Sequence, residues 1–145
     1  MKIYHEDVAV KTNQGIQLHD ISDQVKLIIK ASGINNGFVT VNSKHTTTAL
    51  TINEYESRLM DDVRLFLHKL VPESDKYLHN DIHLRDCPQD EPENAHSHLA
   101  SMLLGNTESI ILKEGDLQLG KWQSIILIEL DGSRNRAVGV QVMGV

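Results

Sequence analysis

The sequence has few aromatic residues and no long apolar run. Phenylalanine, tryptophan and tyrosine make up 4% of the 145 residues, so a hydrophobic core has to consist mainly of isoleucine, leucine and valine. Apolar stretches such as residues 125–130 contain charge, and they fall far short of the roughly 20 residues that cross a bilayer. No segment is therefore predicted to span a membrane.

Cysteine is nearly absent, and so is any export signal. Cys87 is the only cysteine, so no disulfide can form within the chain. Residues 1–6 carry charge from the second position onward and contain no apolar signal core. We therefore expect a cytoplasmic protein.

The sequence also lacks the patterns of two large binding classes. The formal net charge is −6 and lysine and arginine do not cluster, which argues against binding to nucleic acid. No GxGxxG pattern and no GxxxxGKS or GxxxxGKT pattern occurs, so neither a dinucleotide site nor a P-loop is predicted.

What the sequence does contain is a helical period in three segments and strand patterns elsewhere. Helices are predicted at residues 23–32, from residue 57 to the proline at 72, and at 95–104, the last with Asn94 as its cap. Strands are predicted at residues 3–10 and 16–18, joined as a β-hairpin, and at 38–42, 46–52, 109–112, 122–130 and 137–142. Because strands dominate both ends without regular β-α-β alternation, we expect a single α+β domain over residues 1–145. It should have a mixed or antiparallel, β-sandwich-like sheet with about three flanking helices.

Histidine is the residue that points most directly to chemistry. Four of the eight histidines lie in or just after the proline-containing segment 72–93: His79, His83, His96 and His98. His45, at a strand junction, is a fifth candidate. Neutral imidazole is a common zinc ligand, and a catalytic zinc typically has three protein ligands and a water. The alternative is that each histidine is a half-buried surface residue bonded to backbone carbonyls.

The spacing of these residues limits how they can act together. His96 and His98 lie about 200° apart around a helix, so they bind one ion only if His96 has a non-helical backbone. If residues 78–85 are extended, four polar side chains share one face: His79, Asp81, His83 and Arg85. That face would combine a metal ligand, a carboxylate and a phosphate-binding cation. A solvated edge strand with alternating charge fits the same spacing.

Two carboxylates and two arginines complete the candidates. Glu54 follows a predicted strand and is either an acid, base or oxygen ligand, or a solvated turn residue. Glu129 stands in an apolar run, where a carboxylate needs a partner, and Arg134 or Arg136 is the nearest one in sequence. Either arginine is also a candidate for binding substrate phosphate through its planar guanidinium.

Short motifs from residue 38 to the C-terminus resemble the YjbQ-like family and occur in family order. They are His45-Thr46-Thr47 with Ala49-Leu50, Asn53-Glu54, His79-Asn80-Asp81, Asn94-Ala95-His96-Ser97-His98-Leu99, Leu103-Leu104-Gly105, Gly120-Lys121-Trp122-Gln123, and Asp131-Gly132 with Arg134 and Arg136. The resemblance implies an α+β sheet sandwich with flanking helices, assembled as a homotrimer with sites near subunit boundaries. It also implies secondary thiamine-phosphate synthase activity, which joins a pyrimidine diphosphate to a thiazole phosphate and releases pyrophosphate.

These observations together predict a metal-dependent enzyme that acts on small phosphorylated substrates, with thiamine-phosphate synthase as a secondary activity. The expected metal ligands are His45, His79, His96 and His98, and the expected catalytic residues are Glu54, Asp81, Arg85, Arg134 and Arg136. Histidine favours a zinc-like transition metal, whereas magnesium, which prefers oxygen ligands, is possible together with substrate. The alternatives are a metal-dependent hydrolase, with Glu54 or Asp81 as proton acceptor, and a non-catalytic metal- or ligand-binding trimer.

Overall fold

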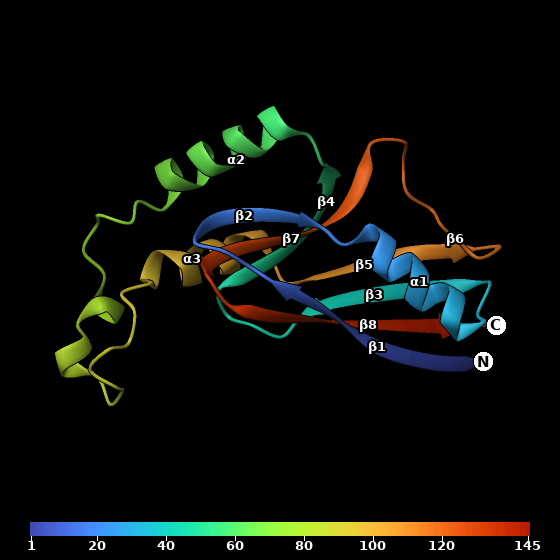
Figure 1. Cartoon of the computed structure of the whole chain (residues 1–145), viewed down its shortest axis with the longest axis horizontal. Coiled ribbons are helices and arrows are strands. Elements are labelled where there is room, and N and C mark those ends of the chain that lie inside the picture. The colour runs from blue at the N-terminus through green and yellow to red at the C-terminus, as the bar shows by residue number, and fades with distance from the viewer.

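Two antiparallel sheets and three α-helices make up the computed structural model, which describes all residues from 1 to 145 (Figure 1). The helices and 3₁₀ turns are α1 (Ser22–Ser32), α2 (Ser57–Leu70), η1 (Leu78–Asn80), η2 (Ile82–Leu84) and α3 (Ala95–Leu104). The strands are β1 (Lys2–Lys11), β2 (Gly15–Asp20), β3 (Gly37–Ser43), β4 (Thr48–Glu54), β5 (Thr107–Lys113), β6 (Asp116–Leu117), β7 (Gln123–Gly132) and β8 (Asn135–Gly144). The five-stranded sheet has the order β1-β8-β3-β5-β6 and the three-stranded sheet the order β2-β7-β4. The predicted α+β class with antiparallel sheets and three helices is confirmed.

The central strand β7 is buried on both faces, which explains its almost continuous apolar run. Side chains alternate between the two faces of a strand. Ile125 and Leu127 belong to the larger of two core clusters, whereas Ile126, Ile128 and Leu130 belong to the smaller one. The three-stranded sheet is therefore the middle layer, with the five-stranded sheet and α1 on one side and α2 and α3 on the other.

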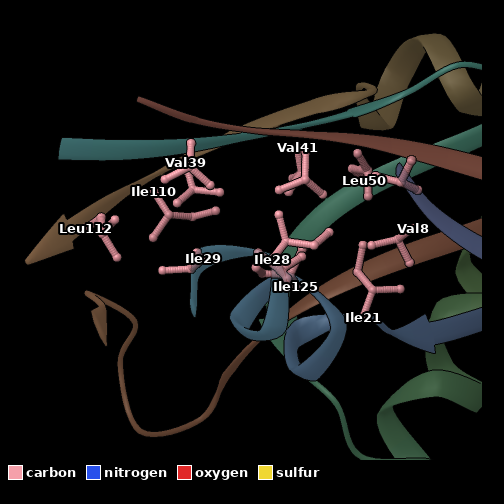
Figure 2. Packing of buried hydrophobic residues seen from close by; sticks show 14 of the residues in the cluster. Val8, Ile21, Ile28, Ile29, Val39, Val41, Leu50, Ile110, Leu112 and Ile125 are labelled. Carbon is pink, nitrogen blue, oxygen red and sulfur yellow. The ribbon is translucent and has the colours of Figure 1, made fainter. Parts of the chain in front are cut away.

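The larger core lies between the two sheets and α1 (Figure 2). Ile28 and Ile29 of α1 face Val39 and Val41 of β3 across this space. All 16 buried residues of the cluster are isoleucine, leucine or valine. The core is thus aliphatic, as the shortage of aromatic residues predicted.

The predicted N-terminal β-hairpin is wrong. β1 pairs with β8 in the five-stranded sheet, whereas β2 pairs with β7 in the three-stranded sheet. Gly15, with a φ of 80°, is the first residue of β2 and lets the chain pass from one sheet to the other. A turn signal marks a change of direction, but the partner of each strand is chosen by contacts with residues more than a hundred positions away.

Residues 71–94 connect α2 to α3 and loop out beyond the sheets (Figure 1), whereas Leu67 of α2 and Val71 just after it pack into the smaller core. Residues 78–85 form η1 and η2 and not an extended strand, so the shared face of alternating side chains does not exist. On α2, three large apolar side chains of the predicted amphipathic helix are exposed: Leu65, Phe66 and Leu70. None of the helices has the length and apolar character to cross a membrane, since the longest has 14 residues.

Candidate functional site

A pocket without hydrophobic lining residues opens where three chain segments meet, and we call it the polar pocket. Its volume is about 650 Å³. The segment before β4, the residues around the start of α3, and the β7–β8 connection line it with Lys44, His45, Thr46, Thr47, Glu91, Asn94, His98, Asp131, Ser133, Arg134, Asn135 and Arg136. These segments meet because β4 pairs with β7 and α3 packs against β4.

Arg136 and Glu129 form a buried ion pair beneath the polar pocket. Nε and Nη2 of Arg136 donate to the two carboxylate oxygens of Glu129 at 2.7 and 2.6 Å. The Thr12 hydroxyl and the Asp131 N–H donate to the same carboxylate at 2.7 and 2.8 Å. Nη2 of Arg136 also donates to the Thr47 hydroxyl at 2.9 Å, and no hydrogen bond within the chain uses Nη1. Arg136 lines the pocket although its side chain is only 4% exposed. The carboxylate of Glu129 therefore has the partner that its sequence context required.

These contacts keep Glu129 ionised although its side chain is 0% exposed. Burial alone would raise the pKa of the carboxyl group. The hydrogen bonds from Arg136, Thr12 and the Asp131 N–H outweigh burial and hold the pKa below its ordinary value. Because the four donor groups come from three parts of the chain, the pair joins the end of β7 to the start of β8 and to the residues after β1.

Asp131 fixes the rim of the polar pocket. Its Oδ2 accepts from Nη2 of Arg134 at 2.9 Å and from Nδ2 of Asn94 at 2.7 Å. The Arg134 side chain remains 43% exposed and its Nη1 is free to bind a ligand.

Asn94 was predicted to cap α3, but its side chain makes no capping hydrogen bond. Oδ1 of Asn80 accepts from the Ala95 N–H in its place.

His45 is held by the backbone of β8. The Ala137 N–H donates to Nε2 of the imidazole at 2.9 Å. Nδ1 has no partner in the chain and is not among the enclosed polar atoms. Burial first, and then the charge of Arg136, lowers the pKa of His45, so the ring is neutral at pH 7.

His98 forms the wall between the polar pocket and a second, more apolar cavity of about 560 Å³. Its ring packs edge to face against His79, with 4.8 Å between the ring centroids. Burial first, and then the neighbouring His79, lowers the pKa of His98, while Asp131 and Glu91 act in the opposite direction. His98 is therefore a neutral imidazole at pH 7 that retains a proton-accepting nitrogen.

Two serines of α3 that the sequence interpretation missed place His98 at this wall. Ser97 donates to the Leu130 carbonyl and Ser101 to the Thr48 carbonyl, each at 2.6 Å. Residues four apart lie on one face of a helix, so the two bonds fix the rotation of α3 about its axis. The available sequence signal was the repeat of small residues at positions 97, 100 and 101, which suits close packing of a helix on a sheet.

The polar pocket brings together four of the predicted site residues from three segments: His45, His98, Arg134 and Arg136. His79 adjoins it through its contact with His98. These residues meet only because β4, β7 and β8 begin or end at the same edge of the fold.

The other predicted site residues lie elsewhere. Glu54 is at the far end of β4 from the pocket, which at about 3.3 Å per residue is roughly 20 Å away. Asp81 lines a different cavity, together with several other acidic residues. Arg85 donates to the His79 carbonyl at 2.9 Å, and His96 lines neither cavity that contains His98.

The four histidines predicted as metal ligands do not form one site within the chain. No group of three or more histidine, cysteine, aspartate or glutamate side chains is placed to hold a metal ion. Nε2 of His45 is occupied by the Ala137 N–H, and His96 and His98 both have helical backbone, so they point to different sides of α3. His79 and His98 alone are in contact. The residues of one chain therefore do not fit a three-ligand zinc site.

We expect the free energy of unfolding to fall as the pH is lowered from about 7.5 to about 5. The pKa values of His19, His45 and His98 are all lowered from 6.5, chiefly by burial, so the unfolded chain binds protons before the folded chain does. The contribution of these histidines to the free energy of unfolding is complete above their pKa in the unfolded chain. It is lost as the pH falls through their lower pKa values in the folded chain. Urea unfolding at a series of pH values measures this. A midpoint that stays constant across the range would contradict it.

Comparison with known proteins gives consistent matches over almost the whole chain. Residues 6–145 match the family model described as "UPF0047 protein YjbQ-like". A UPF0047 protein of Methanothermobacter thermautotrophicus is 40% identical over 144 residues, which cover 99% of this chain and 94% of that protein. A UPF0047 protein of Archaeoglobus fulgidus is 37% identical over 137 residues, covering 94% of this chain and 99% of that protein.

Solved structures agree with these matches. A crystal structure of a YbjQ-like protein of unknown function from Sulfolobus solfataricus P2 superposes with a TM-score of 0.89 at 36% identity, covering 99% of both chains. A hypothetical protein from Aeropyrum pernix K1 also gives a TM-score of 0.89, at 32% identity, covering 98% of this chain and 99% of that one. On this evidence the chain belongs to the UPF0047, YjbQ-like family.

Proposed function

We propose that this chain is an enzyme that binds a small phosphorylated substrate in the polar pocket. The observation that carries the proposal is the pair of guanidinium groups at a pocket with no hydrophobic lining residue. Arg134 donates from Nε to the Asp131 carbonyl and from Nη2 to the Asp131 carboxylate, and Arg136 donates from Nε and Nη2 to the Glu129 carboxylate. Nη1 of each arginine has no partner within the chain. A fixed guanidinium is suited to phosphate because its donors are pre-arranged.

His98 is the proposed acid or base of the reaction. It borders the pocket, its pKa is lowered chiefly by burial, and it is neutral at pH 7. In hydrolysis of a diphosphate, the neutral ring accepts the proton of the attacking water, and the resulting imidazolium returns it to the departing phosphate. The thiazole nitrogen that attacks in thiamine-phosphate formation carries no proton, so only the hydrolysis gives His98 a proton to accept. Asp131 and Glu91 are near enough to stabilise the imidazolium while the proton is held.

The reaction we propose to test first is thiamine-phosphate formation, because the sequence resembles a family with that secondary activity. In this reaction negative charge accumulates on the departing pyrophosphate, and the N–H groups of Arg134 and Arg136 would stabilise it. Analysis of the products separates this transfer from hydrolysis of the diphosphate, which is the alternative reaction in the same pocket.

Metal dependence stays a prediction of the sequence. Among the four histidines predicted as metal ligands, only His79 and His98 have rings in contact within one chain. These two residues are therefore the ones to replace together. Elemental analysis of the wild type and of the double variant His79→Ala and His98→Ala measures any bound transition metal. The homotrimer also stays a prediction, and light scattering measures it.

Binding of inorganic pyrophosphate tests the proposal directly. We expect Arg134→Ala to weaken binding by about tenfold to a hundredfold, the loss of hydrogen bonds to a charged group, with Arg134→Lys recovering only part. Lys121→Ala is the matched control, because it also removes one positive charge but from an exposed side chain over Trp122, outside the pocket. Titration calorimetry measures all four proteins. Failure of the wild type to bind pyrophosphate, or equal binding by Arg134→Ala, would overturn the proposal.

A further inference from the structure

The backbone hydrogen bond to His45 determines which ring nitrogen carries the proton. An N–H group needs an acceptor, so the nitrogen that faces the Ala137 N–H, Nε2, must be the one with a free lone pair. A neutral imidazole has one protonated nitrogen and one accepting nitrogen. The proton of the neutral ring is therefore on Nδ1.

The Ala137 bond also restricts what else His45 can do. Protonation of Nε2 would set two N–H groups against each other, and a metal at Nε2 would displace the backbone donor. A metal at Nδ1 would force the proton onto Nε2, with the same conflict. The ring is thus kept in one tautomer by β8, which is held at Ala137 by its pairing with β1 and from Val138 onward by β3 as well.

The free Nδ1–H lies among groups that recognise an anion. His45 lines the polar pocket next to Thr47, whose hydroxyl accepts from Nη2 of Arg136. Nδ1 has no partner in the chain and is not enclosed, so it is available to a ligand. A neutral donor with a fixed direction complements the two guanidinium groups, because it adds a hydrogen bond without adding charge.

We propose that His45 is a fixed hydrogen-bond donor that binds a phosphoryl oxygen of the substrate through Nδ1–H, and that it is neither a metal ligand nor the base of the reaction. This inference rests on the proposed phosphate-binding function and assigns one further residue to it. The ring of His98 has no hydrogen bond to the backbone, so it retains the freedom to take up a proton that the ring of His45 lacks.

Two substitutions separate the two sides of the ring. A glutamine amide reaches the position of Nε2, so His45→Gln keeps an acceptor for the Ala137 N–H and loses the donor at Nδ1. An asparagine amide reaches the position of Nδ1, so His45→Asn keeps a donor toward the pocket and loses the acceptor. We expect His45→Gln to weaken pyrophosphate binding by about tenfold to a hundredfold with little change in melting temperature. His45→Asn should bind more tightly than His45→Gln but melt at a lower temperature.

The tautomer is measured independently of binding. Nitrogen-15 NMR of the histidine side chains should assign the proton of His45 to Nδ1 at neutral pH, with a shift of that nitrogen on addition of pyrophosphate. A proton on Nε2, or a zinc-induced shift at His45, would overturn the inference. So would wild-type pyrophosphate affinity in His45→Gln. If the wild type does not bind pyrophosphate at all, the proposed function fails and this inference fails with it, whereas binding that is indifferent to His45→Gln rejects the inference alone.

Discussion

Arg136→Met is expected to lower the free energy of unfolding by about 3–5 kcal/mol, because it leaves the carboxylate of Glu129 buried without its counterion. Glu129 is 0% exposed and would keep only the Thr12 hydroxyl and the Asp131 N–H as donors. Methionine fills a similar volume, so the loss measures the missing charge and hydrogen bonds more than a cavity. Urea unfolding at pH 7 and constant ionic strength gives the value.

Arg134→Met is the matched control for this substitution. Arg134 also forms an ion pair, with Asp131, but its side chain is 43% exposed, so we expect a loss of no more than about 1 kcal/mol. Adding Glu129→Gln to Arg136→Met should restore part of the lost stability, since a neutral amide tolerates burial better than an unpaired charge. Equal losses for the two arginine variants would show that the buried pair contributes nothing beyond an exposed one.

His98→Gln is expected to lower kcat/KM for hydrolysis of the pyrimidine diphosphate by about a hundredfold to ten-thousandfold, the usual contribution of a positioned acid or base. The substitution keeps a side chain of similar polarity at the wall of the pocket but removes the group that titrates near neutrality. The His98 ring makes no hydrogen bond within the chain, and among aromatic groups it contacts only the edge of His79. We therefore expect the melting temperature to change little.

The pH dependence of kcat/KM distinguishes a catalytic role of His98 from a structural one. If His98 accepts the proton, activity of the wild type falls on the acid side as the pH passes through a pKa below 6.5, and this limb disappears in His98→Gln. His83→Gln is the control, because His83 is an exposed histidine of η2 that lines neither cavity next to His98. Wild-type kcat/KM in His98→Gln would remove this residue from the mechanism.

The candidate site could be predicted from the sequence only in part. The concentration of histidines and the motifs shared with the YjbQ-like family identified four residues that line the polar pocket, His45, His98, Arg134 and Arg136. Glu54 was grouped with them because it follows a strand, yet β4 carries it to the opposite end of the sheet. The prediction that Asp81 and Arg85 belong to the site assumed an extended backbone at residues 78–85. This segment instead forms two 3₁₀ turns.

Local patterns in the sequence determined the three helices, most of the strands and the aliphatic character of the core, because period, caps and chain composition act over a few residues. Tertiary structure decided which strands pair, so β1 and β2 separated into different sheets although a turn joins them. It also decided that Glu129 pairs with Arg136 and not with Arg134, and that the Ala137 N–H faces Nε2 of His45. Ala137 and His45 are 92 positions apart, so their contact depends on how β8 lies against β1 and β3. A one-residue shift of that register would turn the Arg136 side chain to the other face of the sheet, away from Glu129.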